Sequence, residues 1–147
     1  MKNFSQRFKY TFTVIYVFTI IITSVMDVNE THMTNPLWPP HARFHWAVQY
    51  FSAIMVSLLG LYGIWTKYKD KGGHLSILCI GIGPLLSWGM FIPAFFMPGA
   101  STAPDGINVP ENLPDIFTII HPNFLIACLI TLVSVLTISK EYKRKNP

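Results

Sequence analysis

Charged residues are scarce in this chain: Asp, Glu, Lys and Arg make up 12% of its 147 residues, against 51% for hydrophobic residues. A soluble domain carries about twice that share of charge, and the mean hydropathy here is positive. The sequence also contains neither an HExxH motif nor a Ser-His-Asp pattern, so hydrolysis is a less natural chemistry than redox or proton transfer. The scarcity of charged residues, together with the positive mean hydropathy, excludes an ordinary water-soluble domain.

Cysteine is nearly absent as well. Cys79 and Cys128 both fall inside apolar stretches, where we expect small packing residues and neither a disulfide nor a redox pair. There are no internal repeats. The basic residues do not gather on a soluble face as a nucleic-acid site would require, so we expect no nucleic-acid partner.

Four intervals contain no charged residue, and they are 10–26, 46–66, 75–104 and 116–139. A helix needs about 20 mostly apolar residues to cross a bilayer, where its backbone must be satisfied internally. Prolines suit a first turn, which extends the second helix to residue 40 and the fourth to residue 115. We predict an all-α bundle of four transmembrane helices, forming one integral membrane domain over residues 1–147, with helices at 10–27, 40–66, 75–97 and 115–139.

Prolines also predict where these helices are irregular. We expect a bend near Pro84 in the third helix and a kink near Pro122 in the fourth, beside His121. Residues 23–27 match a signal-peptide cleavage site poorly, so we expect the first helix to be retained.

The distribution of Lys and Arg predicts the orientation of the chain. Apart from Arg43, these residues precede the first helix, fill the second loop or follow the fourth helix: Lys2, Arg7, Lys9, Lys67, Lys69, Lys71, Lys140, Lys143, Arg144 and Lys145. The positive-inside rule then predicts that both termini are cytoplasmic. We expect a multi-pass protein of the cell or inner membrane, in contact with membrane lipids, anionic ones included.

Polar side chains recur at helical spacing on three of the expected helices. The series are Thr19, Thr23, Asp27 and Glu30; His41, His45, Gln49 and Ser52; and Thr118 and His121. Residues so spaced share one helix face, and polar faces turn away from lipid. We therefore expect these faces to converge on one cavity at the extracytoplasmic side.

Such a set of side chains fits two kinds of site. His41, His45 and His121 are candidate ligands for a divalent zinc, iron or manganese ion, completed by Asp27 or Glu30. Without a metal, the same five residues are candidate catalytic acids and bases. Interfacial histidines can also serve only to bond loop carbonyls.

Three more residues are candidates for substrate binding. Trp38 and Arg43 would position a substrate at the membrane interface, and Gln49 would orient the histidines. Trp88 falls in the middle of the third helix, where it could line a cavity or fill the core, and we favour the core interpretation.

The string NPLWPPHARFH at residues 35–45 is followed by an apolar helix that carries Gln49. It resembles the signature of a family of small four-helix integral membrane proteins, which implies the architecture but no particular reaction. More loosely, the architecture is similar to DoxX-like proteins. It is also similar to the emopamil-binding group, in which sterol isomerases use acidic and histidine side chains in a membrane cavity.

Two functional hypotheses follow. The first is a membrane-embedded enzyme acting on a lipid or hydrophobic small molecule through a His/carboxylate pocket near the outer leaflet. The alternative is a non-catalytic accessory protein that binds or transports a ligand, lipid or metal. Transport would require a homodimer or a larger partner, because four helices alone form only a thin wall around a transport path. A purely structural role for the histidines is a third interpretation.

Overall fold

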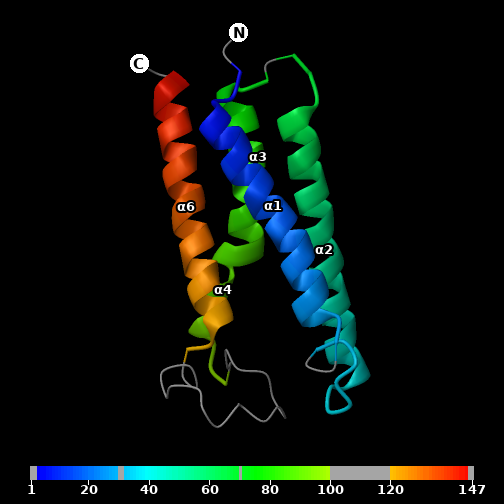
Figure 1. Cartoon of the computed structure of the whole chain (residues 1–147). Coiled ribbons are helices and arrows are strands. Elements are labelled where there is room, and N and C mark those ends of the chain that lie inside the picture. Colours follow the sequence, from blue (N-terminus) through cyan, green and yellow to red (C-terminus); the bar gives the residue numbers. More distant parts are fainter. Residues whose placement is uncertain (1–2, 30–31, 70, 100–119, 146–147) are drawn as a thin grey trace.

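The computed structural model describes residues 3–29, 32–69, 71–99 and 120–145 (Figure 1). Its helices are α1 (Gln6–Asp27), α2 (Pro40–Trp65), α3 (His74–Pro84), the π-helix η1 (Leu85–Gly89), α4 (Phe91–Phe95) and α6 (Pro122–Lys145). Four stretches of this described part are long and apolar enough to cross a membrane: α1, α2, the run from α3 to α4, and α6. The predicted fold class, an all-α bundle of four such helices, is confirmed.

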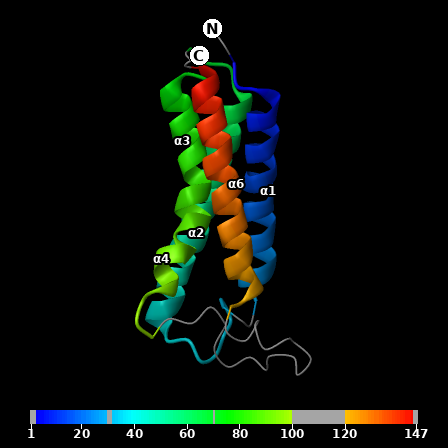
Figure 2. The ribbon, with the colours of Figure 1, turned by 90° about the vertical axis from the view of Figure 1, so that its left-hand side faces the viewer.

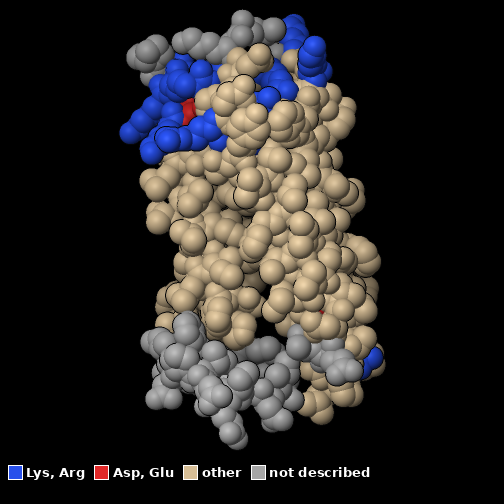
Figure 3. Space-filling view, in the orientation of Figure 1, with Lys and Arg blue, Asp and Glu red and all other residues tan. Residues whose placement is uncertain are grey.

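The four helices lie side by side, and both termini lie at the same end of the bundle (Figures 1 and 2). Helix α1 packs against α2, α3 and α6, while α6 also packs against η1 and α4. Lys and Arg side chains gather at the end that carries the termini (Figure 3). The rest of that face consists mainly of uncharged residues, as lipid-facing helices require.

The ends of α1 and α6 differ from the sequence predictions. Helix α1 begins one turn earlier than expected, because the Ser5 hydroxyl caps it by accepting the Phe8 N–H at 3.1 Å. Ile120 and His121 are not helical, so Pro122 opens α6 and does not kink it. The reason is that proline suits a first turn and disfavours helical backbone at the residue before it. Residues 115–119 of the expected helix lie outside the described residues, and α6 continues to Lys145.

The expected irregularity at Pro84 is present, and it determines how α1 packs. Proline has no N–H, so the Ile80 carbonyl, four residues earlier, loses its usual helical partner. The Tyr16 hydroxyl of α1 donates a hydrogen bond to that carbonyl. Gly60 of α2 and Gly83 of α3 make room, because a Cβ at either position would collide with the Tyr16 ring. Lipid offers helices little hydrophobic drive to associate, so such close packing stabilises the bundle.

Two apolar clusters surround this contact. The first fills the end of the bundle that carries the termini, and it contains Phe4, Phe8, Phe12, Tyr16, Ile64, Ile77 and Ile80. The second lies farther along, where α1, η1 and α6 meet, and it contains Ile15, Trp88, Ala127 and Ile130. Beyond the second cluster the helices no longer fill the space between them.

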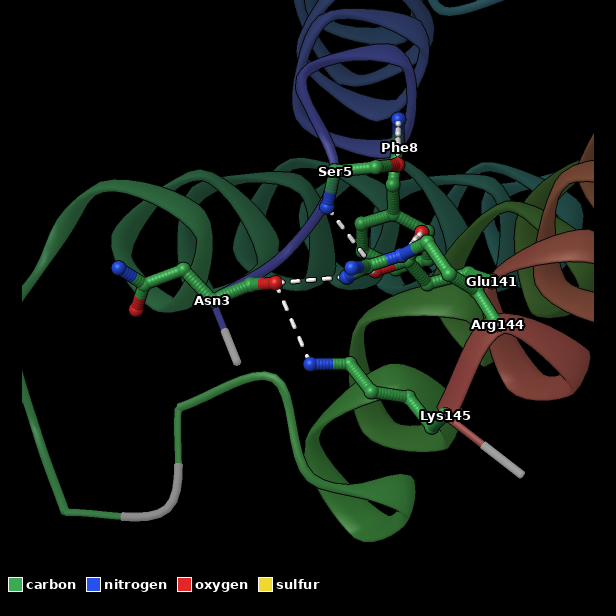
Figure 4. Close-up of polar contacts among 6 residues, drawn as sticks. All are labelled: Asn3, Ser5, Phe8, Glu141, Arg144 and Lys145. Atoms are coloured by element: carbon green, nitrogen blue, oxygen red, sulfur yellow. Dashed lines mark hydrogen bonds and ion pairs between the residues drawn. The ribbon is translucent and has the colours of Figure 1, made fainter. Parts of the chain in front are cut away.

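The first and last described segments are tied together by a buried carboxylate (Figure 4). Glu141 of α6 is 3% exposed, and it accepts the Ser5 backbone N–H at 2.9 Å. It also accepts from Arg144 Nη2 at 2.6 Å. Arg144 Nη2 donates in addition to the Asn3 carbonyl at 2.7 Å, and Lys145 Nζ donates to it at 3.2 Å. These contacts fasten the start of α1 to the end of α6.

Replacing Arg144 with alanine should weaken this connection. The Glu141 carboxylate would stay buried without its cation, so we expect the free energy of unfolding in detergent to fall by about 1–3 kcal/mol. Lys143→Ala is the control, since Lys143 is exposed on the same turn and should change stability by no more than about 0.5 kcal/mol. Thermal unfolding followed by circular dichroism measures both. Equal effects of the two substitutions would contradict the assigned role of Glu141.

Candidate functional site

A cavity of about 710 Å³ opens between the helices at the end of the bundle away from the termini. The surface in Figure 3 is also hollowed near this end. The volume is in the range of small-molecule sites, which are mostly apolar with a few placed polar groups. The cavity follows that pattern, and its polar lining residues are Thr19, Thr23, Asp27, His32, His45, Gln49, Tyr50, Ser52, Ser87 and Asn123.

Helix α1 contributes Thr19, Thr23 and Asp27 to the lining, which is the face that helical spacing predicted. The Thr19 hydroxyl donates to the Ile15 carbonyl at 2.8 Å and accepts the indole N–H of Trp88, also at 2.8 Å. Trp88 is 5% exposed and stacks against Phe91. It therefore fills the core, as the sequence suggested, and also forms part of the cavity wall.

Helix α2 contributes His45, Gln49 and Ser52 to the same cavity. The Nε2 atoms of His45 and His41 lie 3.0 Å apart, and the two rings are nearly perpendicular. One imidazole therefore donates to the other, the direction depending on which tautomers are present. Both histidines are exposed, and of the two His45 alone is among the lining residues. His41 is connected to the cavity through its hydrogen bond with His45.

The loop that carries the NPLWPPHARFH string is held by Asn35, which is buried. The Asn35 side-chain oxygen accepts the Leu37 N–H at 2.9 Å, and its carbonyl accepts the Trp38 N–H at 3.2 Å. Arg43 of α2 reaches back and donates to the same carbonyl at 2.8 Å. Residues 35–38 thus form a turn that is hydrogen-bonded to the first turn of α2. That turn places Trp38 in the cavity wall.

His121 caps α6. Its Nδ1 accepts the Asn123 N–H at 3.4 Å, and its carbonyl accepts the Phe124 N–H at 2.9 Å. Partial burial lowers the pKa of His121 below its ordinary value, and the charge of His32 lowers that pKa further. A neutral imidazole suits this position, because a protonated Nδ1 could not accept the Asn123 N–H.

The predicted site residues are therefore only partly brought together. Asp27, Trp38, His45 and Gln49 line one cavity, His41 joins it through His45, and Arg43 and His121 bind backbone groups beside it. Glu30 and Thr118 lie outside the described residues. Within the described part of the chain, no group of three or more His, Cys, Asp or Glu side chains is arranged to hold a metal ion. The metal site expected from His41, His45 and His121 finds no support there.

Three lining residues, His32, Trp46 and Tyr50, are not among the site residues predicted from the sequence. The His32 ring packs edge-on against Trp38 in the cavity wall, with centroids 5.5 Å apart. The Tyr50 hydroxyl lies 3.0 Å from the Ser24 hydroxyl and bridges α2 to α1. The spacing of Trp46 and Tyr50, four residues apart beside His45 and Gln49, was the available signal.

A scan of the chain against protein-family models gives no match, and no curated protein or solved structure matches it. The resemblances based on the 35–45 string and on the four-helix architecture therefore stay predictions. Function has to be argued from the site itself.

The Thr19–Trp88 bond can be tested by replacing Thr19 with valine, which keeps the shape but removes the acceptor. The buried indole N–H would lose its partner, so we expect a loss of about 1–3 kcal/mol in unfolding free energy. Thr23→Val is a matched control one turn along α1, where the hydroxyl donates to a carbonyl of its own helix. Chemical unfolding monitored by tryptophan fluorescence distinguishes them. The bond is unimportant if both variants unfold at the same denaturant concentration.

Proposed function

We propose that this chain is a multi-pass membrane protein that binds a lipid, or another hydrophobic small molecule with one polar group, in the cavity between α1, α2, η1, α4 and α6. One observation carries the proposal. The cavity is mainly apolar, and three of its polar groups, Asp27 of α1 and His45 and Gln49 of α2, reach it from two different helices. A ligand with an apolar body and a polar end would bury the first and hydrogen-bond the second.

The basic end of the bundle supports an orientation for this site. Lys and Arg side chains gather where both termini lie (Figure 3), and such an excess is typical of the cytoplasmic side. With both termini in the cytoplasm, the cavity would lie in the outer half of the membrane. A hydrophobic ligand would then enter from the outer leaflet.

A second candidate function, catalysis of proton transfer on that same ligand, is favoured by a separate observation. A carboxyl group, Asp27, and an imidazole, His45, reach one cavity from different helices. Two titratable groups of different type are what general acid–base catalysis uses. The exposed His41, hydrogen-bonded to His45, would exchange its proton with the outside. In this scheme one of the two groups removes a proton from the ligand and the other returns a proton at a second atom of the ligand, and exchange through His41 restores the starting protonation states.

Ligand binding predicts that the purified protein retains a hydrophobic molecule. Ala53 lines the cavity, so Ala53→Phe should fill it and lower the amount of co-purified ligand by at least about tenfold, measured by mass spectrometry of organic extracts. Ala47→Phe adds the same volume to α2 at a position outside the lining and should retain the ligand. Circular dichroism checks that both variants are folded. Equal retention by the two variants would falsify the assignment of the ligand to this cavity.

Catalysis predicts a different result for Asp27→Asn and His45→Gln. Once the retained molecule is identified, both substitutions, which keep a hydrogen-bonding side chain, should weaken its binding far less than they lower its conversion, which should fall by about 10²–10⁴-fold, the usual contribution of an acid–base group. His41→Gln should have a smaller effect, because His41 acts through His45. Conversion is measured on reconstituted protein by product analysis. Unchanged conversion in both variants, or none in the wild type, would leave the binding function alone.

A further inference from the structure

A second hollow runs along the outside of the bundle between α2 and α3, and it shares only Val56 and Leu86 with the lining of the candidate cavity. It has a volume of about 480 Å³, and much of its wall is exposed apolar side chain, including Leu59, Leu75 and Ile82. From Leu75 to Leu86 it follows α3 for roughly 16 Å, at 1.5 Å per helical residue. That is about half of the hydrocarbon thickness of a bilayer, or one leaflet.

Three glycines belong to the wall of this groove, Gly60 and Gly63 of α2 and Gly83 of α3. The Tyr16 and Ile80 side chains lie against them, so glycine at these positions lets neighbouring side chains pack close to the backbone along the groove. The Tyr16 hydroxyl, which also lies in the wall, already donates to the Ile80 carbonyl. The groove therefore favours an occupant that is long, narrow and apolar.

The end of the groove nearest the termini is basic. Residues 66–73 join α2 to α3 and contain Lys67, Lys69 and Lys71, with one acidic residue, Asp70, which lies outside the described residues. Lys71 Nζ donates to the Thr66 carbonyl at 2.7 Å and lies 5.9 Å from the centre of the Tyr68 ring. Tyr68 is part of the groove wall. An ammonium group is thus held where the groove begins.

Other positive charges act on this ammonium group. Partial burial lowers the pKa of Lys71, and the positive charges of Lys9 and Lys67 lower that pKa further. Lys9 is itself placed over the Trp65 ring, with Nζ 4.2 Å from the ring centre. Cations from α1 and from the loop therefore repel one another at one place, and a bound anion would relieve that repulsion.

We propose that an anionic phospholipid of the cytoplasmic leaflet binds here, with its phosphate on Lys67 and Lys71 and one acyl chain in the α2–α3 groove. Charge complementarity accounts for the headgroup, and the apolar groove of one-leaflet length accounts for the chain. A soluble phosphate would use only the lysines and would leave the groove without a role. The headgroup of this lipid lies at the basic end of the bundle, away from the candidate cavity, while the far end of the groove shares Val56 and Leu86 with the cavity wall.

The test compares lipids that differ only in their headgroups. Full-length protein in mild detergent is titrated with phosphatidylglycerol or phosphatidylcholine of identical acyl chains, and bound lipid is counted by native mass spectrometry. The wild type should prefer phosphatidylglycerol. Lys67→Gln combined with Lys71→Gln should weaken phosphatidylglycerol binding by about tenfold or more, since each basic group near an anionic lipid contributes roughly a fivefold change.

Further variants provide the controls and test the groove. Lys140→Gln combined with Lys143→Gln removes the same charge from exposed positions of α6 at the same end, and should leave phosphatidylglycerol binding unchanged. Cys79→Phe fills the groove from an exposed wall position and should weaken binding of both lipids. Cys79→Leu replaces it if circular dichroism shows that the phenylalanine variant is unfolded. Ala53→Phe, at a position that lines the candidate cavity and not the groove, should bind phosphatidylglycerol normally.

Three outcomes would overturn the proposal. Equal binding of the two lipids would show that the headgroup is not recognised. Equal losses of binding in the two double-lysine variants would show that only the general positive charge of this end matters. Displacement of bound lipid by sn-glycerol 3-phosphate, with no effect of the Cys79 variants, would identify an anion site without an acyl-chain groove. None of these outcomes depends on whether the cavity at the other end binds its own ligand.

Discussion

The packing of this bundle depends on how one backbone carbonyl is satisfied. Pro84 deprives the Ile80 carbonyl of its helical donor, and in a membrane no water can replace it. Tyr16 supplies the hydrogen bond from α1, and its ring fits because Gly60 and Gly83 have no side chains. Three helices are thereby fixed at one point. One turn farther along α1, Thr19 is placed to receive the Trp88 indole, and the cavity begins there.

Much of the fold could be predicted because membrane helices obey simple rules. The uncharged intervals predicted the four helices that are long and apolar enough to cross a membrane. The paired prolines predicted the start of α2 at Pro40. The start of α1 could not be predicted as well, because it depends on the Ser5 cap and on Glu141, far away in the sequence. The start of α6 was misjudged for a local reason, since the apolar run passes through Pro122 without a break in hydropathy.

In the candidate site, too, features set by local sequence could be predicted, and features set by tertiary contacts could not. Helical spacing correctly placed Thr19, Thr23 and Asp27 on an inward face, since a regular helix fixes their directions. The position of His32 in the cavity wall depends on how the loop folds, and that of Tyr50 depends on which helix is its neighbour. A local sequence pattern predicts neither. Arg43 shows the opposite difficulty. Its place in a conspicuous motif suggested contact with a substrate, whereas its guanidinium holds the Asn35 carbonyl that shapes the loop.

The π-helix η1 has a consequence for the register of the third crossing. A π-helical turn contains one residue more than the α-helical turn it replaces, so it rotates everything after it by about 100°. Phe91, Ala94 and Phe95, which follow η1, line the same cavity as Leu86 and Trp88 within it. The segment Leu85–Gly89 therefore contains one residue more than a regular α-helix would need to cover the same turn. A chain with one residue fewer there would still have four membrane-spanning helices, but the side chains of α4 would be rotated away from the cavity, which would lose one of its walls.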